Sequence, residues 1–216
     1  MANYGRNAQT LDQSFPQRLI SANEQLTVEQ LQSEMETLDK KTADLKEIGI
    51  LDATPVHPFD FETLGDKYDP TQALVMTLYV RDTAGKLKVL DDFADRTRLF
   101  LGSVNAKFQH KRIRLDRQRG LVAKSDKDES LELDYLSSGE QHELVLHYDL
   151  LFRVPPNTVV LIDEPELSLH VAWQKRFLPD LVEIVQLSGF DVLIATHSPF
   201  IVGDREDLMV ALGNTA

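Results

Sequence analysis

A short apolar run that ends in two adjacent carboxylates is the strongest constraint on the fold of this 216-residue chain. Residues 159–162 read Val-Val-Leu-Ile, and Asp163 and Glu164 follow them directly. A helical pattern over about 171–187 comes next, and a second apolar run occupies 192–195. Two buried strands separated by a helix predict an α/β fold, in which a parallel sheet is flanked by helices. Ligands of such sheets bind at the carboxyl ends of the strands, so we expect the chemistry there.

The two carboxylates at the end of the first run suit the hydrolysis of a nucleotide. Asp163 would hold Mg²⁺, usually through water, and Glu164 would orient or deprotonate the attacking water. The alternative is a strand that ends in a solvated acidic turn, and this pattern alone does not separate the two interpretations.

A serine-rich turn opens a helical pattern upstream of these strands. Residues 136–140 read Leu-Ser-Ser-Gly-Glu. The first N–H groups of a helix lack intrahelical partners and lie at the positive end of its dipole, so the turn predicts an anion site. Gly139 would let a phosphate approach the backbone, and Ser137 and Ser138 would add hydroxyl donors. Taken alone, the motif is better interpreted as an ordinary serine cap with the acidic Glu140 in the first turn.

A histidine follows the second apolar run, within the segment Ala-Thr-His-Ser-Pro at 195–199. His197 would hydrogen-bond a γ-phosphate and respond to its loss. A single histidine at a strand end is more often structural. The three motifs in this order are less easily explained by three independent coincidences, and together they favour a nucleotide site.

The motifs resemble those of ABC-type ATPases. The residues of these motifs are more similar to those of the branch that contains SMC, RecF and OLD-like bacterial proteins than to those of transporters. Transporters typically have glycine in place of Ser138 and glutamine in place of Glu140. The resemblance is specific over 135–204, and 10–18 also resembles a segment that follows the Walker A lobe in OLD-like ATPases. The matching motifs are 136–140 for the signature, 159–164 for Walker B, 166–170 with Ser168 for the D-loop, and His197 for the switch histidine.

The resemblance implies a site shared between two subunits, with ATP and Mg²⁺ as cofactors. The signature residues would contact ATP held by an opposing subunit, which is either a second copy or a partner that carries a Walker A motif. Asp163 would be the metal ligand, and Glu164 and His197 would act catalytically on the ATP of their own subunit. The signature residues in question are Ser137, Ser138, Gly139 and Glu140.

A phosphate-binding loop of the form G-x-x-x-x-G-K-[ST] does not occur in the sequence. Such a loop wraps the β- and γ-phosphates in enzymes of this kind. We therefore expect that the chain begins after the loop, and that this polypeptide alone neither binds ATP tightly nor hydrolyses it. A true loss that leaves a pseudoenzyme is the alternative.

The first half of the chain carries two helical seams. A connection marked by Pro55, Pro58 and Pro70 separates them, and they either pair as an antiparallel hairpin or both cover one face of a core. After residue 108, alternating residues predict a small antiparallel β meander. The apolar seam positions are Leu31, Met35, Leu38, Leu45 and Ile48, followed by Leu90, Phe93, Thr97, Phe100 and Val104.

These patterns predict three segments. Residues 1–22 form a lead-in, 23–110 a helical insertion, and 111–216 the C-terminal lobe of an ABC ATPase. The longest apolar runs are too short to span a bilayer, the first residues lack the apolar region of a secretory signal, and there is no cysteine. We expect a cytoplasmic protein without membrane contact.

The formal net charge of -12 would repel nucleic acid at long range, so contact with DNA would need a local basic patch. Residues 111–119 are the one basic concentration, although a solvated hairpin face is favoured because no aromatic residue interleaves there. Its cations are Lys111, Arg112, Arg114, Arg117 and Arg119.

Three functions fit the sequence. The first is part of an ATP-hydrolysing ABC-type dimer that acts in DNA repair and maintenance or in phage defence. The second is a scaffold that offers a signature surface to an ATP-holding partner without turnover of its own. The third is the ATPase part of an OLD-family nuclease.

Overall fold

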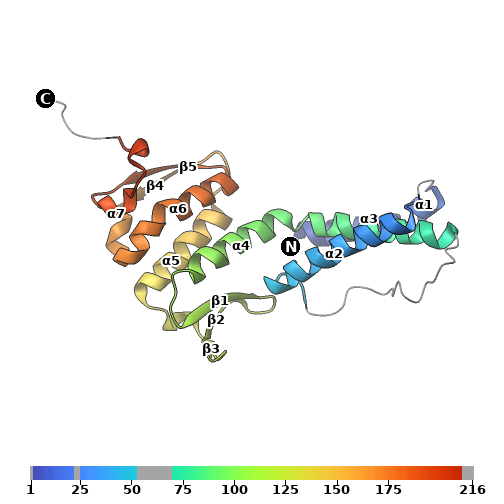
Figure 1. The fold of residues 1–216 in the computed structure, drawn as a ribbon, viewed down its shortest axis with the longest axis horizontal. Coiled ribbons are helices and arrows are strands. Elements are labelled where there is room, and N and C mark those ends of the chain that lie inside the picture. Colours follow the sequence, from blue (N-terminus) through green and yellow to red (C-terminus); the bar gives the residue numbers. More distant parts are fainter. Residues whose placement is uncertain (1, 22–24, 53–69, 211–216) are drawn as a thin grey trace. The chain divides into compact units, whose positions relative to one another are not determined.

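The computed structural model describes residues 2–21, 25–52 and 70–210 (Figure 1). The chain divides into two compact units. Unit 1 comprises Met1–Asp95 with Leu115–Gly120, and unit 2 comprises Arg96–Arg114 with Leu121–Ala216. The division falls inside a helix at residue 95, so the units follow other limits than the segments 1–22, 23–110 and 111–216 suggested by the sequence.

Unit 1 is helical. The second helix begins with Thr27, whose hydroxyl accepts a hydrogen bond from the Gln30 amide, and the Gln30 side chain accepts one from the Thr27 amide. This capping box satisfies two of the donors that a helix start leaves free. The helices of unit 1 are α1 (Ala2–Ser21), α2 (Val28–Glu47), α3 (Pro70–Lys88) and the first turn of α4 (Asp91–Asn105).

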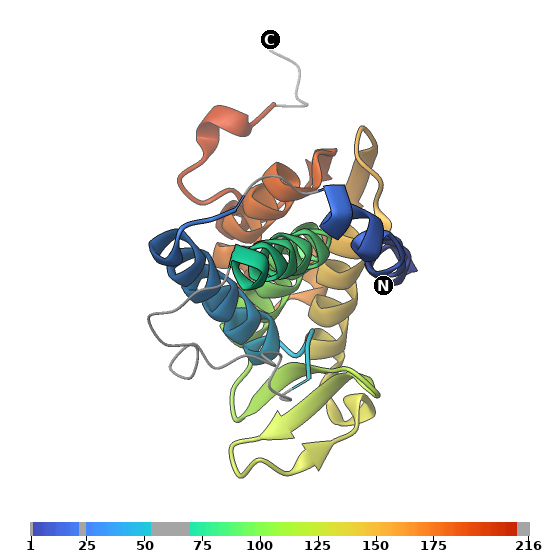
Figure 2. The ribbon, with the colours of Figure 1, turned by 90° about the vertical axis from the view of Figure 1, so that its right-hand side faces the viewer.

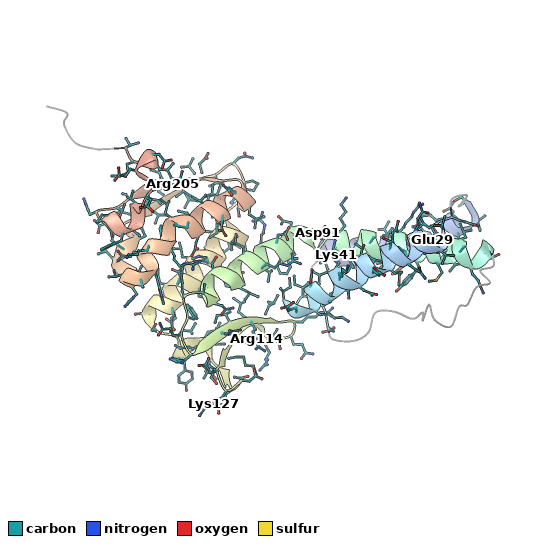
Figure 3. The ribbon with its side chains drawn as sticks, in the orientation of Figure 1. Glu29, Lys41, Asp91, Arg114, Lys127 and Arg205 are labelled. Atoms are coloured by element: carbon teal, nitrogen blue, oxygen red, sulfur yellow. The ribbon has the colours of Figure 1, made fainter. Side chains whose placement is uncertain are left out.

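Helix α3 lies between α1 and α2 (Figure 2). On the α1 side, the Arg18 guanidinium makes a two-pronged ion pair with Asp82, with 2.6 Å between Nη2 and Oδ2. On the α2 side, Leu31, Leu38 and Val80 are buried in one apolar cluster. Lys41 of α2 and Asp91 at the start of α4 form a surface ion pair at 2.5 Å (Figure 3).

The two predicted seams do not pair as an antiparallel hairpin, which is one of the two arrangements that the sequence left open. The first seam lies on α2 as expected, but its partner is α3, a helix that the sequence patterns did not reveal. The second seam lies on α4 apart from Leu90, which precedes the helix. It is divided, since Leu90 packs in the unit 1 cluster whereas Phe100 and Val104 belong to the core of unit 2. Pro55 and Pro58 lie outside the described residues, and Pro70 is the first residue of α3.

The two sheets lie in unit 2, apart from the hairpin turn Leu115–Gly120, which belongs to unit 1. The predicted meander is a three-stranded sheet in the order β1-β2-β3, in which β2 and β3 are antiparallel. The second sheet pairs β4 and β5 in parallel, with α6 between them in the chain. This arrangement confirms the predicted α/β class. The strands are β1 (Lys111–Asp116), β2 (Gly120–Ser125), β3 (Ser130–Leu131), β4 (Val159–Asp163) and β5 (Asp191–Ala195).

The helices of unit 2 pack on these sheets around one apolar core. Phe177, Leu181 and Ile184 of α6 are buried there together with Leu144 of α5. The helices are the rest of α4, α5 (Ser138–Tyr148), α6 (Val171–Ser188) and α7 (Pro199–Val202), with short turns η2 (Leu133–Tyr135), η3 (Asp149–Arg153), η4 (Pro165–Ser168) and η5 (Glu206–Leu208).

The expectation of fully buried strands in the parallel sheet is wrong for one face. Val160 and Ile162 point toward the core and pack against it. Their neighbours Val159 and Leu161 are 64% and 73% exposed, and Leu193 of β5 is 63% exposed. The alternation arises because successive side chains of a strand point to opposite faces. No helix in the described part of the chain is both long and apolar enough to cross a membrane.

Candidate functional site

The carboxyl ends of β4 and β5 bring two of the predicted motifs together. Asp163 is in register with Ala195, and the Glu164 amide donates to the Ala195 carbonyl at 2.8 Å. The chain therefore leaves both strands at the same edge of the sheet (Figure 1). The predicted metal ligand, the predicted base and the histidine segment all follow within three residues of this edge.

Glu164 adopts a left-handed backbone conformation, with φ 44° and ψ 56°. Residues other than glycine seldom adopt it, and such conformations cluster at functional sites because the surrounding structure must hold them. The Glu164 side chain is 41% exposed, and its Oε1 lies 3.8 Å from Nε2 of His197, which is 92% exposed. Two predicted catalytic side chains therefore face each other and are open to a ligand.

Glu166 organises the histidine segment, and sequence reasoning did not single it out. Its Oε2 accepts a hydrogen bond from the Thr196 hydroxyl at 2.8 Å. Its Oε1 accepts from the amides of His197 at 2.8 Å and Ser198 at 3.1 Å. Burial alone would raise the pKa of Glu166, but these donors hold it below its ordinary value. The predicted D-loop thus fixes the backbone that presents His197.

Gln174 extends the same network from α6. Its amide donates to the carbonyl groups of Glu166 and Leu169, and its Oε1 accepts from the Ser198 hydroxyl at 2.9 Å. The side chain is 8% exposed. These hydrogen bonds, together with those of Glu166, connect the loop after β4 to the loop after β5.

The predicted signature turn begins α5, as expected. Ser137 is the N-cap and Glu140 completes a capping box, so the motif is also the serine cap that the alternative interpretation described. Glu140 Oε2 accepts from the Ser137 amide at 2.7 Å and from the Ser137 hydroxyl at 2.9 Å. The amides of Ser138 and Gly139 have no hydrogen-bond partner among the described residues.

Lys111 of β1 also contacts Glu140, with 2.6 Å between Nζ and Oε2. The lysine side chain is 24% exposed and the glutamate side chain 10%. Burial alone would raise the pKa of Glu140, but the hydrogen bonds from Lys111 and Ser137 hold it below its ordinary value. Glu140 is therefore an anion near neutral pH, despite being buried.

A cavity of about 290 Å³ lies beside this turn. A methyl group placed on Gly139 would come within 3.5 Å of the Ser168 carbonyl and 3.7 Å of the Trp173 ring, so the helix start and the D-loop are close neighbours. Trp173 stacks on Phe108, with ring centroids 6.2 Å apart. The lining residues are Lys107, Gln109, Ser137, Gly139, Glu140, His170 and Trp173.

The predicted site residues thus form two groups in unit 2. Ser137, Gly139 and Ser168 lie around the α5 start, whereas Glu164 and His197 lie at the strand ends. Within the described ranges, no hydrogen bond or ion pair joins one group to the other.

A buried charged cluster was not foreseen from the sequence. The Lys107 ammonium contacts the Glu143 carboxylate and lies 2.7 Å from Asp180 Oδ2. His147 Nδ1 lies 3.0 Å from the Glu143 carbonyl oxygen. These residues are each at most 5% exposed. The four-residue spacing of Glu143 and His147 on one helix is the sequence signal that could have indicated this cluster.

The basic hairpin is largely neutralised by its surroundings. Besides Lys111, three of its arginines have a carboxylate partner, and the Arg114 side chain, labelled in Figure 3, is 61% exposed. Arg112 has no partner in the part of the chain that the structure describes. The three pairs are Arg114 with Asp128, Arg117 with Asp52, and Arg119 with Asp116.

Two solved structures show a limited similarity to the chain. One comes from work on ATP-driven dimerization and DNA stimulated activation of SMC ATPases, with 20% identity over 53% of this chain and 74% of that chain and a TM-score of 0.35. The other is the Smc head domain with an extended coiled coil bound to the C-terminal domain of ScpA derived from Pyrococcus furiosus. It has 17% identity and a TM-score of 0.37, and the alignment covers 93% of this chain but only 49% of that one.

Sequence comparison identifies the family. No curated protein sequence matches the chain. The family described as "AAA domain, putative AbiEii toxin, Type IV TA system" matches residues 59–203, which is more than half of the 216 residues. The match spans all the predicted ATPase motifs and confirms the resemblance to AAA-type ATPases. The chain is therefore a member of this AAA domain family.

Proposed function

We propose that this chain supplies two surfaces of an ATP-binding, ATP-hydrolysing ABC-type assembly. The observation that carries the proposal is the meeting of Glu164 and His197 at 3.8 Å beyond the strand that ends in Asp163. A metal-binding acid, a general base and a histidine at the carboxyl edge of a parallel sheet are three of the groups that nucleotide hydrolysis uses. Membership of the AAA domain family supports the same reaction class.

The residues fit a nucleotide with its metal ion. Asp163 lies on the exposed face of β4, so its carboxylate is open to a hydrated Mg²⁺. Glu164 is the proposed general base, and His197 would hydrogen-bond the γ-phosphate. When bound, Mg²⁺ would neutralise phosphate charge and ATP would provide the leaving group.

The α5 start is the proposed surface for a second nucleotide. Ser138 and Gly139 offer two free amides at the positive end of a helix dipole, beside the cavity. The ATP contacted here would be held by a second copy or by a partner with a Walker A motif. DNA repair and maintenance or phage defence is the proposed setting.

Paramagnetic NMR tests the proposal on the chain itself. Mn²⁺ substitutes for Mg²⁺, and with millimolar ATP we expect it to broaden the amide signals of Asp163, Glu164 and His197 selectively. Asp163→Asn should abolish the effect, whereas Asp191→Asn, an exposed acid at the opposite end of β5, should not. Equal broadening in the Asp163→Asn protein would refute the metal assignment.

A scaffold without turnover, which offers its signature surface to an ATP-holding partner, is the second candidate. The two candidates differ in whether ATP is hydrolysed when a Walker A-bearing partner is supplied.

DNA contact through the hairpin is a further proposal, with Arg112 as its only unpaired arginine in the described structure. Reversing Arg112, Arg114 and Arg117 to glutamate should abolish any DNA binding and flatten its salt dependence.

A further inference from the structure

The signature turn carries a charge that opposes its proposed task. Glu140 lies in the first turn of α5 and lines the cavity beside the free amides of Ser138 and Gly139. A carboxylate there stabilises the helix through its dipole, but it repels a phosphate that approaches the same helix end. A turn of this composition therefore needs a compensating cation before it can bind an anion.

Lys111 is placed to provide that compensation. Its ammonium lies 2.6 Å from the same Glu140 oxygen that caps the helix, so one oxygen accepts from the Ser137 amide, the Ser137 hydroxyl and the lysine. Both side chains are largely withdrawn from solvent, which reduces screening by salt. Among the described residues, Lys111 is the only cation that forms an ion pair with Glu140.

The remaining surface of the turn is free to bind. The capping interactions use the Ser137 amide and hydroxyl, and leave the amides of Ser138 and Gly139 without a partner in the described chain. Gly139 has no Cβ to shield its amide from a ligand in the adjacent cavity. When the charge of Glu140 is neutralised, these two donors and the helix dipole make the electrostatic potential at the site positive.

We propose that Lys111 is a positioning residue of the nucleotide site, which neutralises Glu140 so that the start of α5 can accept the phosphates of a nucleotide. The inference rests on the function proposed for the signature turn. It also gives Lys111 a role other than the DNA contact suggested by the sequence. Lys111 acts by cancelling the charge of Glu140, so removing both charges together must restore the affinity that is lost when the lysine alone is removed.

The test is a double-mutant cycle read by NMR, with inorganic tripolyphosphate as the probe. Titration of the wild-type chain should shift the amide signals of Ser138 and Gly139. Lys111→Met should weaken binding by about tenfold, because one uncompensated charge remains near the phosphate. Glu140→Gln should tighten binding by about as much, and since glutamine also completes a capping box, the helix start is retained.

The combined variant decides between neutralisation and other roles. Lys111→Met with Glu140→Gln should bind within about twofold of the wild type, because neither charge is then present. Lys127→Met, which removes a lysine from the exposed turn between β2 and β3 (Figure 3), is the matched control and should bind like the wild type. Fluorescence of Trp173 verifies that each variant is folded.

Each other outcome overturns the inference. If the Ser138 and Gly139 signals respond in the wild type but Lys111→Met leaves the affinity unchanged, Lys111 has no positioning role and the proposed anion site stands. If the combined variant stays as weak as Lys111→Met, the lysine acts by some means other than neutralising Glu140. If the wild type shows no response, the anion role of the turn fails as well, whereas the Mn²⁺ experiment still tests the strand-end site.

Discussion

Replacing Lys107 with methionine should strongly destabilise unit 2. The lysine follows α4, and its ammonium contacts Glu143 of α5 and Asp180 of α6, so three elements meet at one cation. The three side chains are 1%, 0% and 7% exposed. Methionine keeps most of the aliphatic stem but removes the charge, and the core volume is nearly retained.

The magnitude follows from the two carboxylates that would stay behind. Removing one partner from a buried ion pair costs about 3–5 kcal/mol, because an uncompensated charge is left in the interior. Glu143 Oε2 already has no hydrogen-bond partner among the described residues, so little is available to replace the lysine. A typical domain is stable by about 5–15 kcal/mol, so the loss is a large fraction of the total.

Urea denaturation followed by Trp173 fluorescence is the assay. Trp173 is the only tryptophan of the chain and lies in unit 2, so the signal does not report on unit 1. Arg176→Met is the matched control, since its guanidinium is 58% exposed and 3.9 Å from Asp180, and such surface pairs contribute about 0–1 kcal/mol. Adding Glu143→Gln to Lys107→Met should recover part of the loss. A loss for Lys107→Met no larger than that of the control would refute the reasoning.

Three further predictions concern single groups. Burial holds the pKa of His147 below its ordinary value of about 6.5, so below that pH the unfolded chain takes up a proton that the folded chain does not. The free energy of unfolding should therefore be highest above this pH and fall as the pH drops. Denaturation curves at several pH values should show that His147→Gln reduces this pH dependence. In an ATP-hydrolysing assembly, Glu164→Gln should block turnover and trap the closed dimer, whereas Asp163→Asn should weaken both hydrolysis and ATP-dependent association, as seen in light scattering; hydrolysis by Glu164→Gln at the parent rate would show that the base is misassigned. Glu166→Ala removes three hydrogen bonds from the segment that presents His197, so amide exchange there should accelerate; unchanged protection would show that other contacts hold the loop.

The sequence alone determined the local elements of the site. Apolar runs bounded by acids or by Thr-His-Ser specify two strands, and Ser137 with Glu140 specifies the start of α5, because these signals involve residues that are neighbours in the chain. The resemblance of the motifs to those of known ATPases also predicted an AAA-type ATPase, which the family match over 59–203 confirms. The roles of Asp163, Glu164 and His197 stay predictions.

Only the tertiary structure decided which distant groups meet. The tertiary structure pairs α2 with α3 and leaves one face of β4 exposed. It also brings Lys111 to Glu140, and Glu166 to the segment that carries His197. In each of these contacts the two partners lie far apart in the sequence. The sequence pattern of an acid in the first turn of a helix is the same whether that acid contacts solvent or a lysine from a strand. Periodicity specifies which face of an element is apolar, but the element that covers this face, and the charge that neutralises a buried acid, depend on how the whole chain packs.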